Sequence, residues 1–301
     1  MPTIVVRPPR PEELHRAEEL VVRSINDLTQ RHGFGPMATL RPPEFQLFSL
    51  RDDPDGLWLA EADGEILGFA FSWMCGDLWF LAELFVAPGQ QGRGIGKELL
   101  TRTFEHARKA GATKKALITF TFNIVSQGLY IRHGLFPRFP IYFFSIERDA
   151  LMRRLQGEKL RSTYIEDTTS DLNRLREIDC AALGISRERH HRYLLNDGTM
   201  RGYFIHARDD CIGYAYVSAT GHVGPLAVEQ PTAMGVAFTT ALNLAAGSGA
   251  SQVSAFLPGA NEMALGIAAE HGMRITFPMV LVSNRAFGDW TRYLPRNPGF
   301  M

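Results

Sequence analysis

The sequence has few of the features that mark secreted, metal-binding or membrane proteins. Its three cysteines, Cys75, Cys180 and Cys211, are odd in number and widely spaced, and no Cys-x-x-Cys pair occurs. This pattern suggests neither a disulfide framework nor a zinc cage. No apolar run approaches the roughly 20 residues that span a bilayer, and residues 1–10 contain no apolar stretch that could act as a signal peptide. We therefore expect a cytoplasmic protein with no membrane partner.

Neither sign of charge is in excess. Lysine plus arginine and aspartate plus glutamate are equal at 32 each, so no net field draws the chain to nucleic acid. The histidines give no metal site, because His190 and His191 are adjacent and cannot share one metal in the i, i+4 arrangement. We expect neither a metal nor a nucleic-acid partner.

Composition and apolar spacing indicate a mixed α/β protein. At 301 residues the chain is comfortable for two domains, and its 45% hydrophobic and 21% charged residues are typical of packed cores. Alternation, helical spacing and turn signals place the elements of the first half. Strands are expected at residues 3–7, 57–61, 66–73, 78–86, 117–122 and 141–146, and helices at 11–31, 94–109 and 123–133. The expected fold class is α/β, a central mixed β-sheet flanked by helices.

The second half repeats this order from about residue 200. Strands are expected at residues 203–207, 212–218, 223–228, 253–257 and 279–283, and helices at 233–246 and 261–271. Residue pairs 138 positions apart support a duplication: Gly111 and Gly249, Asn123 and Asn261, His133 and His271, Phe139 and Phe277. We predict a first domain at residues 1–150 and a second at 161–301, joined by the charged stretch 147–161, which we expect to be partly helical.

A glycine-rich loop, Gln91-Gly92-Arg93-Gly94-Ile95-Gly96-Lys97, joins an expected strand to an expected helix. Glycines let successive N–H groups turn inward, and the helix N-terminus adds the positive end of its dipole, which suits a pyrophosphate. A Walker loop would need glycine at 91 and Ser or Thr at 98, where Gln91 and Glu98 stand, and a dinucleotide fingerprint would need a small residue in place of Lys97. A glycine-rich turn without a ligand is the alternative.

Two motifs resemble the GNAT family of N-acetyltransferases. Gln91, Gly94 and Gly96 match its Gln/Arg-x-x-Gly-x-Gly/Ala signature. The later run from Asn123 through Tyr130 to Gly134 and Leu135 resembles the Asn…Tyr…Gly-Phe element of the family. The resemblance covers residues 3–147 in the right order, and the internal repeat implies a second, degenerate copy of the same fold.

The resemblance implies acetyl-CoA as the co-substrate and gives roles to the site residues. The backbone of Phe85 and Val86 would bind the pantetheine arm, the loop amides would cradle the pyrophosphate, and Asn123 would contact the arm. The full set of expected cofactor-binding residues is Phe85, Val86, Gln91, Gly92, Arg93, Gly94, Ile95, Gly96, Lys97 and Asn123.

Two further residues are candidates for proton transfer. Tyr130 would protonate the departing sulfur, and the alternative is a tyrosine that packs its helix on the sheet. Glu83 stands between the apolar Ala82 and Leu84 on the strand that leads to the loop, where a carboxylate could accept a proton from the amine. The alternative for Glu83 is an exposed face of that strand.

The second half departs from the pattern where chemistry would be needed. Its loop reads Glu229-Gln230-Pro231-Thr232-Ala233, without alternating glycines, and Ala268 stands where the offset places Tyr130. This half is expected to be non-catalytic and to complete the core, shape the acceptor cleft or support a homodimer. The predicted function is transfer of acetyl to a primary amine of a small molecule, peptide or protein. The alternative is an acetyl-CoA sensor or scaffold without turnover.

Overall fold

The computed structural model describes residues 3–155 and 160–301, and within these the chain forms two compact units. Each unit is built from several separate segments of the chain. Unit 1 consists of Met1–Ile118, Phe122–Phe136 and Ser283–Arg285, and unit 2 of Thr119–Thr121, Pro137–Val282 and Ala286–Met301. Each unit therefore contains residues from both halves of the sequence.

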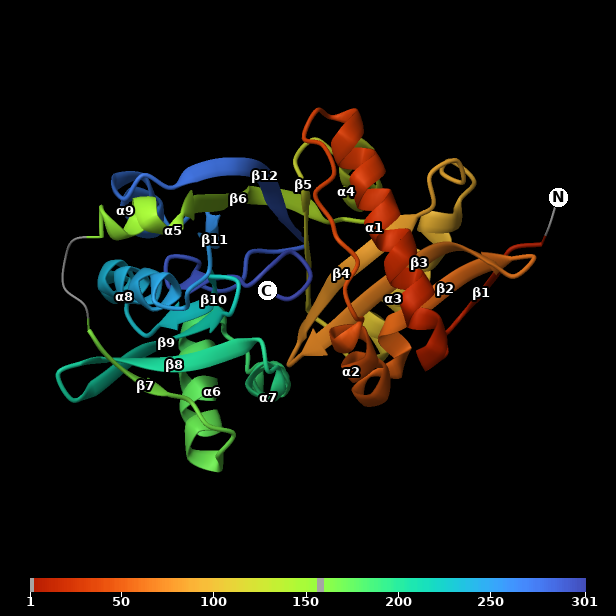
Figure 1. The fold of residues 1–301 in the computed structure, drawn as a ribbon. Coiled ribbons are helices and arrows are strands. Elements are labelled where there is room, and N and C mark those ends of the chain that lie inside the picture. Colours follow the sequence, from red (N-terminus) through yellow and green to blue (C-terminus); the bar gives the residue numbers. More distant parts are fainter. Residues whose placement is uncertain (1–2, 156–159) are drawn as a thin grey trace. The chain divides into compact units, whose positions relative to one another are not determined.

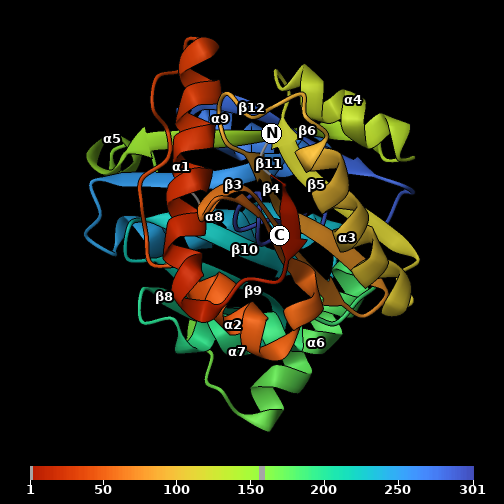
Figure 2. The ribbon, with the colours of Figure 1, turned by 90° about the vertical axis from the view of Figure 1, so that its right-hand side faces the viewer.

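Unit 1 is a twisted sheet with helices on both faces. Its elements are β1 (Val5–Arg7), η1 (Pro11–Glu13), α1 (Leu14–Arg31), α2 (Glu44–Asp52), η2 (Pro54–Gly56), β2 (Leu57–Ala62), β3 (Glu65–Cys75), β4 (Leu78–Val86), α3 (Ile95–Lys109), β5 (Lys114–Phe120) and α4 (Ile124–Arg132). The strands follow the order β1-β2-β3-β4-β5, antiparallel up to β4, and β5 runs parallel to β4. Helices α1 and α3 lie on opposite faces of this sheet (Figure 2).

Local sequence explains how these strands are joined. Asp63 and Gly64, with φ of 51° and 81°, form the two-residue turn between β2 and β3. Such turns need positive φ at both central residues, which glycine and aspartate accept more readily than most residues. A parallel strand cannot follow through a hairpin, so α3 provides the crossover from β4 to β5.

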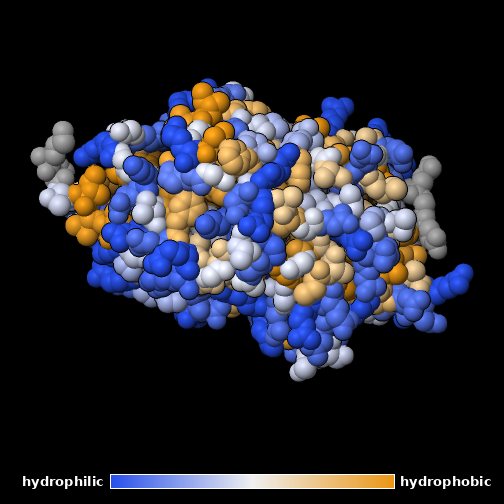
Figure 3. Space-filling model, turned by 180° about the vertical axis from the view of Figure 1, so that it is seen from behind, coloured by the Kyte–Doolittle hydropathy of each residue, from blue (hydrophilic) through white to orange (hydrophobic). Residues whose placement is uncertain are grey.

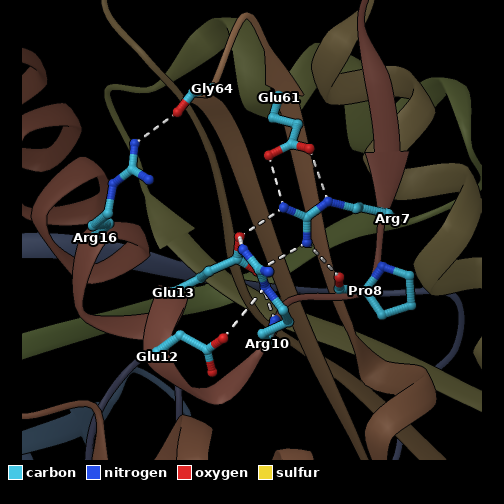
Figure 4. A network of polar contacts seen from close by, with 8 residues as sticks. All are labelled: Arg7, Pro8, Arg10, Glu12, Glu13, Arg16, Glu61 and Gly64. Carbon is cyan, nitrogen blue, oxygen red and sulfur yellow. Dashed lines mark hydrogen bonds and ion pairs between the residues drawn. The ribbon is translucent and has the colours of Figure 1, made fainter.

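Ion pairs of Arg7 with Glu13 and Glu61 connect the first strand, β1, to its neighbours in the fold (Figure 4). Arg7 on β1 donates to both oxygens of Glu13 at 2.8 and 2.7 Å and to both oxygens of Glu61 at 2.9 and 2.7 Å. Glu13 is buried, and the hydrogen bonds from Arg7 hold the pKa of its carboxyl well below the usual range. Charge-assisted pairs of this kind are among the stronger polar contacts in proteins.

Unit 2 is also a sheet with helices packed on its faces. Its elements are β6 (Phe136–Glu147, from Pro137 on), α5 (Arg148–Met152), β7 (Arg161–Tyr164), α6 (Thr169–Leu183), α7 (Glu188–Asn196), β8 (Met200–Ala207), β9 (Asp210–Ser218), β10 (His222–Val228), η3 (Pro231–Ala233), α8 (Met234–Ala246), β11 (Gln252–Pro258), α9 (Glu262–Glu270), β12 (Arg274–Ser283) and β13 (Tyr293–Leu294). The strand order is β12-β6-β11-β10-β9-β8-β7, and β13 pairs with β10. Helices α6 and α8 pack on opposite faces of β9 and β10 (Figure 1).

The internal repeat has a structural counterpart at each marker residue. Asn123 and Asn261 are the N-caps of α4 and α9, and each side chain accepts from the amide three residues on. His133 and His271 follow these helices, and the Nδ1 atom of each lies 2.8 Å from the carbonyl oxygen four residues earlier. The paired asparagines and histidines thus terminate equivalent helices. Two copies of one mixed α/β fold make up the chain.

The strand β6 lies in unit 2 although it belongs to the first half of the sequence. It pairs antiparallel with β11 from Gln252↔Glu147 to Pro258↔Ile141. Conversely, Asn284, which follows β12, belongs to unit 1, where its side chain accepts from the Lys115 amide at 2.8 Å. The expected linker 147–161 contains the short helix α5, and its residues 156–159 lie outside the described residues.

In the described part of the chain, every helix is too short or too polar to cross a bilayer. On the face drawn in Figure 3, apolar side chains are interspersed with polar and charged ones.

Candidate functional site

The glycine loop of unit 1 turns the chain from β4 into α3 with a left-handed backbone. Gly92 and Gly94 have φ of 80° and 83°, and Gly94 is the N-cap of α3. A Cβ atom added at either position would meet nothing within 4 Å, so these glycines are needed for backbone conformation rather than for space. The sequence alone would not separate these two reasons.

The loop presents a run of free donors. Among the described residues, the amides from Gln91 to Lys97 donate to no backbone carbonyl, and Glu98 is the first amide of α3 that closes onto the chain, at 3.0 Å from the Gly94 oxygen. Gly92 and Gly94 are exposed to solvent. Free amides at a helix N-terminus, with glycines that let the backbone approach, form a site for an anion.

The side chains of the loop differ in their surroundings. Ile95 is buried and anchors the start of α3 in the core with Leu99, whereas Arg93 and Lys97 are exposed and add positive charge. Gln91 folds back toward β4, and its Nε2 lies 3.4 Å from the Val86 oxygen. Gly96 faces Val86, whose Cγ2 would be 3.5 Å from an added Cβ atom.

Strands β4 and β5 part beside this loop. Their parallel pairing runs only from Leu78↔Lys114 to Leu81↔Leu117, although β4 continues to Val86. One extra residue of β4, Ala82, interrupts its pairing with β3 at the same point. A bulge bends its strand and increases the local twist, so β4 diverges from β5 just before Phe85 and Val86. Beyond Leu81 this edge of β4 has no pairing with β5, and the Val86 oxygen lies 3.4 Å from each of two side-chain donors, Ser24 Oγ and Gln91 Nε2.

Glu83 follows the bulge and faces a second carboxylate. The Glu83 Oε1 atom accepts from Gln46 Nε2 at 3.0 Å, and the same amide donates to Glu18 Oε2 at 3.2 Å. The Oε2 atom of Glu83 is shielded from solvent and has no hydrogen-bond partner among the described residues. Glu83 is therefore not an exposed strand residue, and it keeps one free acceptor oxygen.

The environment of Glu83 suits a base that works near neutral pH. Burial and the nearby charge of Glu18 raise the pKa of Glu83 to about 8, against a smaller opposing effect of the hydrogen bond from Gln46. Burial also raises the pKa of Glu18. Two carboxylates that share one environment do not ionise together readily, so one of them holds a proton at neutral pH.

Glu18 and Gln46 were not among the residues singled out from the sequence. Glu18 lies on α1 four residues after Leu14 and three before Val21, both of which are buried, so a carboxylate on the apolar face of this helix is the signal that could have found it. Gln46 lies on α2, which no sequence pattern predicted.

Tyr130 lies on α4, and Asn123 directly precedes this helix. Tyr130 is 5% exposed, burial raises the pKa of its phenol, and its hydroxyl has no hydrogen-bond partner among the described residues. Asn123 uses its Oδ1 to cap α4, accepting from Ser126 at 3.2 Å. No hydrogen bond joins Tyr130 to Glu83 in the described structure. Unit 1 thus contains the loop, the diverging strands and both proton-transfer candidates.

The matching region of unit 2 has no such loop. Val228 leads through Glu229 into η3 and α8, and no residue from 228 to 234 has positive φ. Among the described residues, no group of His, Cys, Asp and Glu side chains is arranged to hold a metal ion.

Comparison with known proteins gives a family match in the first half of the chain. Residues 22–135 match the acetyltransferase (GNAT) family. The sequence is 34% identical over 87 residues to a mycothiol acetyltransferase from Streptomyces avermitilis, a match that covers 27% of this chain and 27% of that protein. The chain thus matches only about a quarter of the length of this relative.

Solved structures extend the likeness to the whole chain. The solved structure of a Pyrococcus horikoshii protein superposes with a TM-score of 0.77 at 18% identity, covering 99% of this chain and 96% of its own. A tandem GNAT protein from the clavulanic acid biosynthesis pathway gives a TM-score of 0.63 at 16% identity, covering 95% and 98%. At these identities the likeness establishes the fold. Residues 22–135 therefore resemble the acetyltransferase (GNAT) family, and the chain as a whole has the fold of a tandem GNAT protein.

Proposed function

We propose that the chain is an acetyl-CoA-dependent N-acetyltransferase whose working site lies in unit 1. The observation that carries the proposal is the run of free amides at the start of α3 beside the unpaired edge of β4. A pyrophosphate fits the first feature and an extended amide chain fits the second, and a CoA thioester joins both in one molecule. The proposed domains are residues 1–150, with this site, and residues 161–301, without turnover.

The residues of the loop and of β4 suit this ligand in different ways. The amides from Gly92 to Lys97 would bind the pyrophosphate, with Arg93 and Lys97 adding positive charge. The backbone of Phe85 and Val86 would pair with the pantetheine arm where β4 leaves β5. Asn123, whose Oδ1 caps α4, would offer its Nδ2 donor to the arm. Bound acetyl-CoA supplies an activated acetyl group as a thioester.

Glu83 is the proposed base. An amine attacks only as the neutral form, so a group must take up its proton near physiological pH. Glu83 has the raised pKa and the free oxygen for this role. Gln46 is a positioning residue, since its Nε2 holds Oε1 of Glu83 and leaves Oε2 for the acceptor. Glu18 adds negative charge that raises the basicity of Glu83 and favours a cationic acceptor.

Tyr130 is the proposed acid. Its phenol is held neutral by burial, and its hydroxyl has no competing partner among the described residues. A neutral phenol can donate its proton to a departing thiolate in a site that excludes water. Ala268 stands at the matching position of the second half, which supports turnover in the first half alone.

The proposed acceptor is a primary amine of a small molecule or peptide. The mycothiol acetyltransferase relative supports acetyl transfer, and the two carboxylates near Glu83 support an acceptor that arrives as an ammonium. The test is release of the CoA thiol from acetyl-CoA in the presence of a panel of primary amines. Amine-dependent release is expected. Binding of acetyl-CoA without release for any amine would favour the sensor function instead.

A further inference from the structure

Unit 2 has a counterpart of the place where β4 and β5 diverge. Its strands β10 and β11 pair in parallel only at His222↔Ser254 and Val223↔Ala255. In unit 1 the ladder ends at Leu81↔Leu117, and Leu117 and Ala255 are 138 positions apart, the spacing of the repeat. The two ladders therefore stop at the same point of the duplicated fold.

The bulge is repeated too. The pairing of β10 with β9 shifts by one residue between Val223 and Leu226, directly after the last pair with β11. Residues 226–228 of β10 therefore correspond to residues 84–86 of β4, and Pro225 stands in the place of Glu83. Unit 2 has kept the divergence of the strands and has lost the proposed base.

In unit 2 the corresponding edge of β10, at residues 226–228, is already paired with another segment of the same chain. The short strand β13 lies antiparallel to β10, with Leu226 opposite Leu294 and Ala227 opposite Tyr293. The Val228 amide donates to the Arg292 oxygen at 3.0 Å. These are the positions that match the proposed arm-binding backbone of unit 1. Because buried backbone groups must find partners, the segment meets a need that a ligand would otherwise meet.

Asn261 strengthens the correspondence. It is the repeat partner of Asn123, and it caps α9 with its Oδ1 just as Asn123 caps α4. Its Nδ2 donates to the carbonyl oxygens of Trp290 and Thr291, each at 3.1 Å. The donor that in unit 1 would reach the pantetheine arm thus holds the backbone of residues 290–291 in unit 2.

Buried side chains and hydrogen bonds hold residues 290–294 and the residues that follow them in place. Trp290, Tyr293 and Leu294 are buried, and Arg292 donates to the Glu229 oxygen at 2.9 Å, at the start of the loop that replaces the glycine cradle. Farther on, the fully buried Arg187 donates to the Met301 oxygen at 2.7 Å. An occupant tethered to its own cleft has an effective concentration in the range of about millimolar, far above that of a dilute ligand.

We propose that residues 290–294 are the resident occupant of a cleft in unit 2 that corresponds to the acyl-CoA arm site of unit 1, and that they close the second half to acyl-CoA. The cleft accepts an extended peptide in the manner of an added strand. The comparison with an arm site rests on the function proposed for unit 1, whereas the pairing of β13 with β10 does not.

Hydrogen exchange of the full chain, with and without saturating acetyl-CoA, tests this proposal. The amides of residues 226–228 and 290–294 should exchange slowly, and acetyl-CoA should not change their rates. The amides of residues 84–86 and 92–97 should slow by about tenfold or more on binding. Slow, ligand-insensitive exchange at 290–294 without any protection in unit 1 would support the closed cleft and refute the function proposed for unit 1.

Two matched variants sharpen the result. Asn261→Ser keeps a capping oxygen but removes the Nδ2 donor, so exchange at residues 290–294 should rise by about tenfold. Asn123→Ser makes the same change in unit 1 and should leave residues 290–294 unaltered while weakening acetyl-CoA binding. Exchange of residues 290–294 at the rate of an unstructured peptide, or its acceleration by acetyl-CoA with a second molecule bound, would overturn the proposal.

Discussion

The pKa of Glu83 makes a quantitative prediction for the dependence of the reaction on pH. With a pKa of about 8, roughly one molecule in eleven carries Glu83 ionised at pH 7, and about ten in eleven do so at pH 9. If Glu83 is the base, kcat at saturating amine should rise about tenfold over this range and then level off. Glu83→Gln should remove the rising limb and lower kcat by about 10²- to 10⁴-fold.

The carboxylate of Glu18 provides the internal test. Its negative charge raises the pKa of Glu83, so Glu18→Gln should move the rising limb to lower pH with the same acceptor. Glu19→Gln is the control, because it makes the same change one residue on, at an exposed side chain paired with His15. If wild type and Glu18→Gln showed the same dependence of kcat on pH, the reasoning would be refuted, because the rising limb would then reflect the ionisation of the amine substrate alone.

The same shift predicts a stability effect of defined sign. The folded chain holds the Glu83 proton up to about pH 8, whereas the unfolded chain loses it near pH 4.5. The contribution of this proton to the free energy of unfolding is fully present below pH 4.5 and is lost as pH rises through about 8. Glu83→Gln should therefore raise Tm relative to wild type at pH 9 more than at pH 5, as thermal melting would record.

Three further outcomes are expected. Tyr130→Phe should lower kcat by about 10- to 10⁴-fold and leave the Kd for acetyl-CoA nearly unchanged, and an unaltered kcat with a good acceptor would show that the thiolate leaves without this donor. Arg7→Ala should lower the free energy of unfolding, measured in denaturant, by about 1–3 kcal/mol, because two carboxylates lose their partner. Arg16→Ala is the control: it removes an exposed contact to a backbone oxygen and should change the free energy of unfolding by less than about 0.5 kcal/mol. Fragments 1–150 and 151–301 should each melt below the full chain, because unit 2 requires β6 and unit 1 includes Ser283–Arg285; a first fragment with full-length Tm and activity would contradict this.

The strands and the glycine loop of unit 1 were predictable because their signals are local. Strand β4 begins at Leu78 and ends at Val86 as expected, since the apolar run ends at Pro88 and Gly89. The loop glycines predicted a turn with free amides, and the left-handed φ at Gly92 and Gly94 is the reason those residues are glycine. The repeat offset predicted that the two halves would share one order of elements.

Features that depend on distant contacts were not predictable. The pairing of β6 with β11 joins residues more than a hundred positions apart, so a division at residue 150 follows the repeat and not the compact units. Strand β13 has only two residues, Tyr293 and Leu294, and is defined by its partner rather than by its sequence. The hydrogen bond to Glu83 comes from Gln46 on α2, whose sequence carries little periodic signal.

The most direct test of the account is the number of acetyl-CoA molecules that one chain binds. Calorimetry with the full chain should give one site per chain, and Gly94→Glu should abolish it by placing a side chain and a negative charge among the free amides of the loop. Gly111→Ala replaces another left-handed glycine with an open Cβ position and should leave binding unchanged. Two equivalent sites in the wild type, or unaltered binding by Gly94→Glu, would contradict the placement of the single working site in unit 1.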